Sequence, residues 1–266
     1  MTGTILDNIF SDKRVRVEAA KRASDPVAMR DRAIETRSSL GSRRLREALS
    51  DGSRINIIAE FKKASPSKGV INDRVDPAEV AGQYEAGGAA AISVLTEEDH
   101  FRGSLDDLRA VREVVDIPIL RKDFIFDPFQ IFEAAAVGAD AILLIAAMLE
   151  DSQLQDLASL AEDEIGLDAL IEVHTLEELE RVSNLSPGLI GVNNRDLKTF
   201  AVSLDISREL IKHMPAGVVA VTESGLKTGS DMRELKASGY SGFLIGETLM
   251  RTGDSADELR RLRDQG

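Results

Sequence analysis

The feature that most constrains the fold is a repeated alternation of short apolar runs and helix-period segments from residue 55 onward. Most of the runs are apolar on both faces, which is typical of parallel strands covered on both sides. Alternating strands and helices require crossover connections, so the sequence predicts an α/β fold. The eight runs lie at residues 55–61, 90–97, 117–124, 141–147, 168–174, 189–196, 218–224 and 242–247.

Helix-start signals stand between these runs. Asp76 and Asp127 each precede a proline, which suits the first helical position, and Ser104 precedes a third helix-period segment. Thr175 is followed three residues later by Glu178, a spacing that predicts a capping box. Four of the eight apolar runs are therefore followed by a helix with a recognisable start.

Eight such units can close into a barrel or spread into a doubly wound open sheet. The number matches the barrel, and neither G-x-G-x-x-G nor G-x-x-x-x-G-K-[ST] occurs to support a nucleotide-binding sheet. We expect a (β/α)8 TIM barrel over residues 55–266. Segments 18–37 and 42–50 predict helices, so residues 1–50 form an N-terminal helical extension. No linker interrupts the chain, and residues 1–266 are expected to be one domain.

Composition argues against several classes of function. The net charge of −13 argues against general nucleic-acid binding. Residues 1–50 nevertheless hold 11 Lys and Arg against 7 Asp and Glu, which fits either a nucleic-acid arm or, as we favour, solvated helix faces. The absence of cysteine excludes disulfides, thiolate metal sites and a cysteine nucleophile.

Targeting and membrane segments are not evident. Residues 1–14 lack a basic start followed by an apolar run, so they do not resemble a signal peptide. The most apolar segment, residues 134–149, is interrupted by Asp140 and is too short to span a bilayer. We expect a cytoplasmic protein that does not associate with membranes.

Charged side chains gather where the apolar runs end. The stretch IIAEFKKASPSKG leaves its strand through Glu60 and Lys62, whose alternation points them to one side while Phe61 and Lys63 point to the other. Strand ends converge on one mouth of a barrel, where unpaired charges are costly unless they meet each other or a charged ligand. The set therefore predicts a polar active site. Its later members are Lys122, Glu172, Asn193, Arg195, Glu223 and Ser224.

The last two apolar runs carry a second signal. Ser224-Gly225 and Gly246-Glu247 place small residues between a strand and a helix. Each pair alone would be an ordinary tight turn, but barrels commonly bind phosphate in their last two strand–helix loops. The sequence therefore indicates a phosphate site.

The histidines and one turn give weaker signals. The histidines are isolated and show no metal-ligand spacing: His100, His174 and His213. We expect no metal site. The turn at residues 101–104 fits either a mobile lid over the mouth or a simple loop.

These motifs together resemble the indole-3-glycerol-phosphate synthase family of tryptophan biosynthesis. They cover nearly the whole chain in the family's order: TILDNI, IIAEFKKASPSKG, SVLTE, FRGS, ILRKDFI, IEVH, GVNNRDL, TESG and LIGETLM. The resemblance implies a barrel whose N-terminal helices close over the mouth. It also implies conversion of 1-(2-carboxyphenylamino)-1-deoxyribulose 5-phosphate, a phosphorylated small molecule, to indole-3-glycerol phosphate with loss of carbon dioxide and water. Oligomeric state is left open, a monomer being compatible.

The resemblance also implies site residues. The family's catalytic positions match Glu60, Lys62, Lys122, Glu172, Asn193 and Ser224, and its phosphate-binding positions match Ser65, Gly225, Gly246 and Glu247. Family members vary between serine and glutamate at the last position, so a backbone N–H of Glu247 is the expected ligand. Arg195 and Glu223 fall on further site positions of the family and are expected to contact substrate.

The chemistry of this reaction suggests a role for each group. Ring closure requires an acid for the ketone oxygen, for which Lys122 is the candidate. Dehydration requires an acid and a base, assigned to Lys62 and Glu60, although Lys62 could equally hold the substrate carboxylate. Glu172 would assist an acid step and Asn193 would orient carboxylates and hydroxyls. Ring closure leaves an iminium that accepts the electrons of decarboxylation, so no cofactor is required.

Three rival functions are open to test. A strand-end lysine also suits a Schiff-base aldolase, which borohydride would trap. A phosphoribosyl-type isomerase would use the same phosphate loops, but its chemistry needs only one acid and one base. A non-catalytic ligand-binding barrel would bind without turnover, although binding alone gains little from like charges that face each other.

Overall fold

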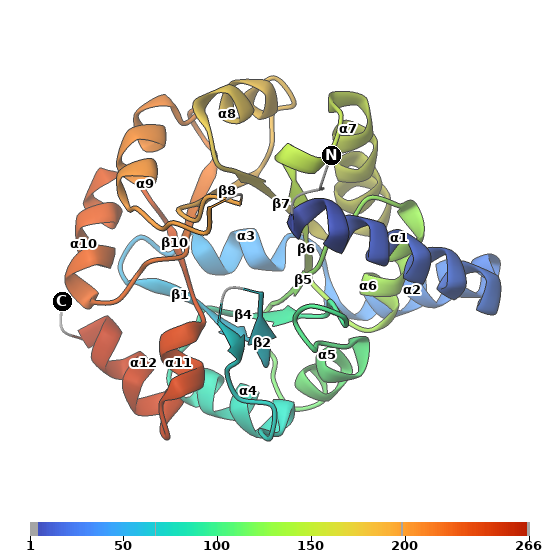
Figure 1. Ribbon diagram of the computed structural model, residues 1–266, viewed down its shortest axis with the longest axis horizontal. Helices are drawn as coiled ribbons and strands as arrows, with labels where there is room; N and C mark the ends of the chain where they lie inside the picture. Colours follow the sequence, from blue (N-terminus) through green and yellow to red (C-terminus); the bar gives the residue numbers. More distant parts are fainter. Residues whose placement is uncertain (1–4, 67, 198, 265–266) are drawn as a thin grey trace.

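The computed structural model describes residues 5–66, 68–197 and 199–264, and among these eight parallel strands close into a barrel (Figure 1). β1 pairs with both β4 and β10, which closes the ring and confirms the barrel over the open sheet. The strands in chain order are β1 (Asn56–Phe61), β4 (Ala91–Leu95), β5 (Ile119–Lys122), β6 (Ala141–Ile145), β7 (Asp168–Val173), β8 (Leu189–Asn193), β9 (Val219–Glu223) and β10 (Gly242–Ile245).

Each strand lies inside its predicted run, and most end before the run does. The extra residues, such as 194–196 after β8, leave the strand ladder and belong to the loops at the mouth. A short antiparallel pair, β2 (Ala64–Ser65) with β3 (Gly69–Val70), follows β1 outside the predicted runs.

Helices surround the barrel in Figure 1. They are α4 (Pro77–Ala86), α5 (Leu105–Arg112), α6 (Pro128–Ala136), α7 (Asp151–Ser159), α8 (Leu176–Ser183), α9 (Asp205–Leu210), α10 (Gly229–Ser238), α11 (Glu247–Arg251) and α12 (Ser255–Asp264). η1 (Ala146–Met148) and η3 (Ile211–His213) are single 3-10 turns, and η2 (Leu160–Ile165) is a π-helical segment that continues α7. No helix in the described part of the chain is long and apolar enough to cross a membrane.

The predicted helix starts are confirmed, with one exception in detail. The side chains of Asp76, Ser104 and Asp127 accept hydrogen bonds from backbone N–H groups in the first turn of α4, α5 and α6. Thr175 caps α8 in the same way, but the capping box predicted there is incomplete. The Glu178 carboxylate bonds the N–H of His174, one residue before the cap.

The N-terminal extension consists of α1 (Ile5–Ala23), α2 (Pro26–Leu40) and α3 (Arg44–Leu49). The prediction of one helix over residues 18–37 is wrong. Asp25 ends the run because proline disfavours a helical conformation in the residue before it, and Asp25 then caps α2 through the N–H groups of Val27 and Ala28.

Two apolar cores flank the strands. One lies between the strands and the surrounding helices, and the other fills the barrel interior. Leu45 and Leu49 of α3 belong to the interior core together with strand residues such as Leu170 and Leu244. α3 runs across the barrel in Figure 1 and thus closes the end of the barrel opposite the mouth, which we call the base.

Candidate active site

A cavity of about 1130 Å³ opens at the carboxyl ends of the strands. It brings together side chains from strand ends up to about 190 residues apart in the chain, as the barrel predicted. The predicted site residues that line it are Glu60, Lys62, Ser65, Lys122, Glu172, Asn193, Arg195, Ser224, Gly225, Gly246 and Glu247. Glu223 is fully buried beside it and contacts Lys122.

Lys122 lies at the centre of the charged groups. Its Nζ is 2.5 Å from Oε2 of Glu223 and 3.5 Å from Oε2 of Glu60. Burial lowers the Lys122 pKa, but Glu223, Glu60 and Glu172 outweigh burial and raise it. Burial raises the Glu60 pKa, but Lys62 and Lys122 outweigh burial and lower it. Near neutral pH the cavity therefore presents an ammonium and a carboxylate in contact.

The predicted alternation after β1 is confirmed. Lys62 Nζ bonds Oε1 of Glu60, so both side chains face the cavity. Phe61 packs in the outer core, and Lys63 Nζ lies 2.7 Å from Asp107 on α5.

Glu223 has an unusual environment for a carboxyl group. Burial, together with the charges of Glu172 and Glu60, raises its pKa to about 7 against the attraction of Lys122. Its Oε1 has no hydrogen-bond partner among the described residues. An alanine Cβ at Gly191, on the neighbouring strand β8, would lie 2.5 Å from this oxygen, so glycine there leaves room for the carboxyl group. Glu223 can therefore gain or lose a proton near neutral pH.

Glu172 is held by groups on two sides. His174 Nε2 lies 3.2 Å from its Oε1, and the Asn193 side chain also favours the ionised form and so lowers its pKa. Burial raises the Glu172 pKa, but His174, Lys122 and Asn193 lower it to about 2. The prediction that His174 is isolated is thus wrong. The i, i+2 spacing of Glu172 and His174 places both on one side of an extended chain, and this was the signal in the sequence.

The turn after β9 is conformationally unusual. Ser224 has a φ of 65° and Gly225 a φ of 83°, both in the left-handed region that favours glycine. The side-chain amide of Asn194 donates to the carbonyl oxygens of Glu223 and Ser224 at 2.9 and 3.1 Å, which holds the turn.

Gly246 follows β10 at the edge of the cavity. An alanine Cβ there would collide with the Glu60 carboxylate. The side chain of the next residue, Glu247, lies 3.2 Å from Arg251 and 3.7 Å from Lys68. Glycine at 246 thus makes space for Glu60, a role that sequence reasoning missed because it depends on contact between the first and last strands.

Comparison with known proteins identifies the family. A family model described as indole-3-glycerol phosphate synthase matches residues 6–262. The chain belongs to the indole-3-glycerol phosphate synthase family.

Curated relatives with the same description span the full length. The indole-3-glycerol phosphate synthase of Carboxydothermus hydrogenoformans is 47% identical over 97% of this chain and 98% of the relative. The enzyme of Azospirillum brasilense is 45% identical over 97% of this chain and 98% of the relative. The enzyme of Salinibacter ruber is 46% identical over 99% of this chain and 96% of the relative.

More distant solved structures share the fold alone. Thiamine phosphate pyrophosphorylase from Pyrococcus furiosus superposes with a TM-score of 0.59 at 17% identity, over 82% of this chain and 95% of that one. KGPDC from Streptococcus mutans gives a TM-score of 0.59 at 11% identity, over 78% of this chain and 95% of that one.

This member of the synthase family also lines its cavity with apolar groups that sequence reasoning did not assign. Ile5, Leu6 and Ile9 come from α1, while Phe101 and Phe124 come from the loops after β4 and β5. A wall of this kind suits a planar aromatic ring. TILDNI and FRGS contain several of these residues, but their meeting point requires the docked position of α1.

α1 is fixed beside the mouth by paired charges and aromatic contact. The buried Lys13 ammonium lies 2.8 Å from Asp123 and 3.0 Å from Glu98. The rings of Phe10 and Phe126 meet edge to face at 4.8 Å. Basic residues of the extension thus pair with acidic residues of the barrel, which accounts for part of the uneven charge.

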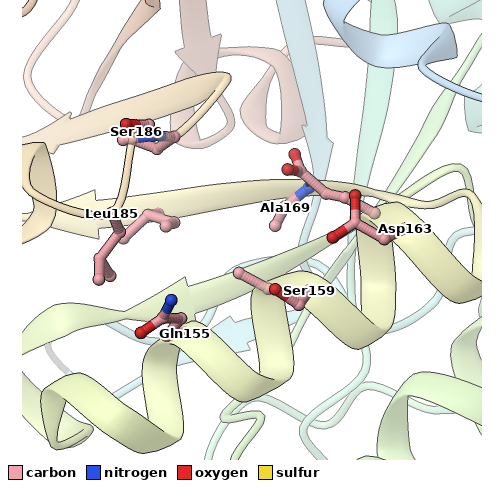
Figure 2. Close-up of a pocket in the computed structure, with 10 residues that line it drawn as sticks. Gln155, Ser159, Asp163, Ala169, Leu185 and Ser186 are labelled. Atoms are coloured by element: carbon pink, nitrogen blue, oxygen red, sulfur yellow. The ribbon is translucent and has the colours of Figure 1, made fainter.

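A smaller pocket of about 200 Å³ lies away from the mouth (Figure 2). Gln155 and Ser159 of α7 and Asp163 of η2 line it, with Leu185 and Ser186 from the connection before β8. It has no residue in common with the cavity at the mouth.

Proposed function

We propose that this cavity carries out the indole-3-glycerol-phosphate synthase reaction of tryptophan biosynthesis. The observation that carries the proposal is the Lys122 ammonium held between the Glu60 and Glu223 carboxylates in a large strand-end cavity. The apolar wall suits the carboxyphenyl ring, and the loops after β9 and β10 suit the phosphate. Family membership supports the same substrate, 1-(2-carboxyphenylamino)-1-deoxyribulose 5-phosphate.

Ring closure would begin with attack of the aryl carbon on the ketone carbon. The ketone oxygen gains negative charge and takes a proton from Lys122. The raised Lys122 pKa keeps the proton available, and transfer remains favourable because an alkoxide is a far stronger base than an amine. Glu223, with a pKa of about 7, can return a proton to the lysine afterwards.

Decarboxylation would follow without a cofactor. The carbon–carbon bond to the carboxylate breaks, and its electron pair moves into the iminium formed by ring closure. The Glu172 carboxylate is placed to stabilise the positive charge of this iminium. Its pKa of about 2 disfavours the acid role expected from the sequence, because it carries no proton near neutral pH.

Dehydration would complete the indole. A proton from Lys62 leaves with the hydroxyl as water, and Glu60 accepts the ring proton that restores aromaticity. The alternative that Lys62 holds the substrate carboxylate until its loss remains compatible with the Lys62–Glu60 ion pair. Asn193, at the end of the neighbouring strand β8, would favour the ionised form of Glu172 and orient substrate hydroxyls.

Phosphate binding would use the last two loops and the turn after β1. Ser65, Gly225, Gly246 and the backbone N–H of Glu247 are the proposed ligands, since the Glu247 carboxylate already faces Arg251 and Lys68. Ser224 and Arg195 would support substrate at the rim, where Arg195 also donates to the Phe200 carbonyl oxygen at 3.3 Å.

A fluorescence assay for indole-3-glycerol phosphate, run on wild type, Lys122→Ala and Lys122→Arg, tests the proposal. We expect turnover by wild type and a loss of about 10²–10⁴-fold in kcat for both variants. Arginine keeps the charge but does not release its proton in proteins, so it separates proton donation from charge alone. Full activity in Lys122→Arg would assign the proton to another group.

The same proteins address the aldolase rival. A Schiff base needs a neutral amine, whereas the carboxylates around Lys122 raise its pKa. Borohydride with substrate is therefore expected to leave wild type active and unlabelled. Irreversible labelling at Lys122 would favour the aldolase.

A further inference from the structure

A line of buried and partly buried side chains leads from the cavity to the first turn of α8. Glu172, at the cavity, lies 3.2 Å from Nε2 of His174. His174 Nδ1 lies 3.3 Å from Oε2 of Glu178, which also accepts the His174 backbone N–H at 2.7 Å. The side chains of Glu172, His174 and Glu178 are 3%, 8% and 15% exposed, so solvent screens these contacts little.

We propose that His174 is a positioning residue of the active site, with its imidazolium held by Glu178 so that it orients Glu172 and keeps it ionised. The inference deepens the proposed function and rests on it, because the catalytic meaning of Glu172 comes from there.

The charges around the cavity explain why Glu172 needs its own cation. Glu60 and Glu223 share the cavity region with it, and burial among like charges favours protonation. The Lys122 ammonium is in contact with Glu223 and Glu60. His174 is thus the closest positive group that the structure gives to Glu172.

The flanking strands and the turn η1 add no competing charge. β6, β8 and η1 contain no ionisable residue, and β8 contributes only the Asn193 amide, which lowers the Glu172 pKa. Glu178 approaches the imidazole from α8, and Lys122 on β5 acts on Glu172. Burial lowers the His174 pKa, but Glu172 and Glu178 outweigh burial and raise it to about 10. Because the pKa of His174 is raised and that of Glu172 is lowered, the two side chains form an ion pair at neutral pH.

A purely structural role for His174 predicts different behaviour. Thr175 already caps α8, and the backbone N–H of any residue at 174 could bond Glu178. Only the ring nitrogens connect Glu178 to Glu172. Thr175→Ala is therefore a matched control, since it weakens the start of α8 without removing the imidazole.

The first test is the pH profile of kcat/KM for wild type, His174→Gln, Glu178→Gln and Thr175→Ala. Loss of the imidazolium raises the Glu172 pKa, so we expect the acid limb of His174→Gln to move up by at least one pH unit. Activity on that limb would fall at least 10-fold, recover at pH 8.5, and do so through kcat with little change in KM. Glu178→Gln would shift in the same direction by less, and Thr175→Ala would keep the wild-type profile. If kcat/KM of His174→Gln were lower than that of wild type by the same factor at every pH, the proposal would be overturned.

The second test needs no turnover. The sequence holds only three histidines, so the His174→Gln spectrum assigns the His174 imidazole in an NMR titration of the full chain. We expect His174 to stay protonated to about pH 9 in wild type and to lose its proton at least one unit lower in Glu178→Gln. Titration near 6.5 in wild type would overturn the inference. An inactive wild type would overturn the proposed function, and this titration would still decide whether His174 is held as a cation.

Discussion

The two ends of the barrel both bury charge, but they arrange it differently. At the mouth, Lys122 contacts Glu60 and Glu223, and one oxygen of Glu223 has no partner among the described residues. At the base, Asp140 precedes β6 and is fully buried, yet both of its oxygens are paired. The arginines that meet it are Arg37, Arg44 and Arg112, at 2.8–3.0 Å.

Most donors of the base arrangement are satisfied as well, although Arg37 Nε has no partner among the described residues. Arg37 also bonds the Ala139, Gly41 and Gly166 carbonyl oxygens, and Arg112 bonds those of Val115 and Ile117. Arg37 and Arg44 belong to α2 and α3, so Asp140 ties the N-terminal extension to the barrel. A buried carboxylate whose two oxygens are both paired in this way holds structure.

The mouth differs in the groups it uses. Lysine and glutamate change protonation state when their surroundings change, whereas arginine stays charged. The pKa values at the mouth move in opposite directions, to about 7 for Glu223 and about 2 for Glu172. Such divergence is typical of groups that exchange protons. The comparison predicts that substitutions at the mouth cost activity and those at the base cost stability.

The largest expected effect is that of Glu60→Gln at the mouth. The change keeps the shape of the side chain but removes the proposed base, so kcat is expected to fall about 10³-fold. Fluorescence of the product gives the rate, and urea unfolding on the same sample gives stability, which we expect to change little. A rate within 10-fold of wild type would remove Glu60 from the chemistry.

Asp140→Ala is the corresponding change at the base. It leaves arginines facing each other in a buried site, so the free energy of unfolding should fall by about 3–5 kcal/mol. Folded Asp140→Ala at low temperature should keep kcat within a few-fold of wild type. A large loss of kcat in a stably folded variant would show that the base communicates with the mouth and would break the comparison.

The sequence predicted the features that depend on local pattern. Periodicity located the strands, and the barrel rule then brought Glu60, Lys122 and Glu172 to one mouth without any distance information. The break between α1 and α2 also has a local signal, since Asp25 precedes Pro26 and proline disfavours a helical conformation in the residue before it.

Contacts between distant segments were not predictable from pattern. Lys13 meets Asp123 across 110 positions, which requires the docked position of α1. Asp140 looked only like an interruption of an apolar segment, since nothing local marks Arg37 or Arg112 as its partners. Periodicity gives the side of a strand on which a residue lies, whereas pairing depends on how whole elements pack.

Two glycines at opposite ends of β10 sharpen the comparison within one strand. An alanine at Gly246 collides with the Glu60 carboxylate, so Gly246→Ala should lower kcat about 10-fold with little effect on unfolding. At Gly242 the new Cβ would lie 3.0 Å from Val221 and 3.2 Å from Leu49, which overpacks the barrel interior above α3. Gly242→Ala should cost about 1–3 kcal/mol of stability and leave kcat unchanged. If the two substitutions changed kcat equally, or changed the free energy of unfolding equally, the distinction between mouth and base would be wrong.

The last expected effect is a difference in how stability depends on pH. His174 has a folded-state pKa of about 10 against an ordinary 6.5, so its stabilisation is complete below pH 6.5 and is lost as pH rises toward 10. For one proton the slope is at most about 1.4 kcal/mol per pH unit. Urea unfolding at several pH values between 6.5 and 10 should show a shallower decline in His174→Gln than in wild type. Asp140→Ala should lower the whole curve without changing its slope, because the arginines at the base stay charged throughout this range. Parallel curves for wild type and His174→Gln would mean that the imidazole is not held as a cation in the folded protein.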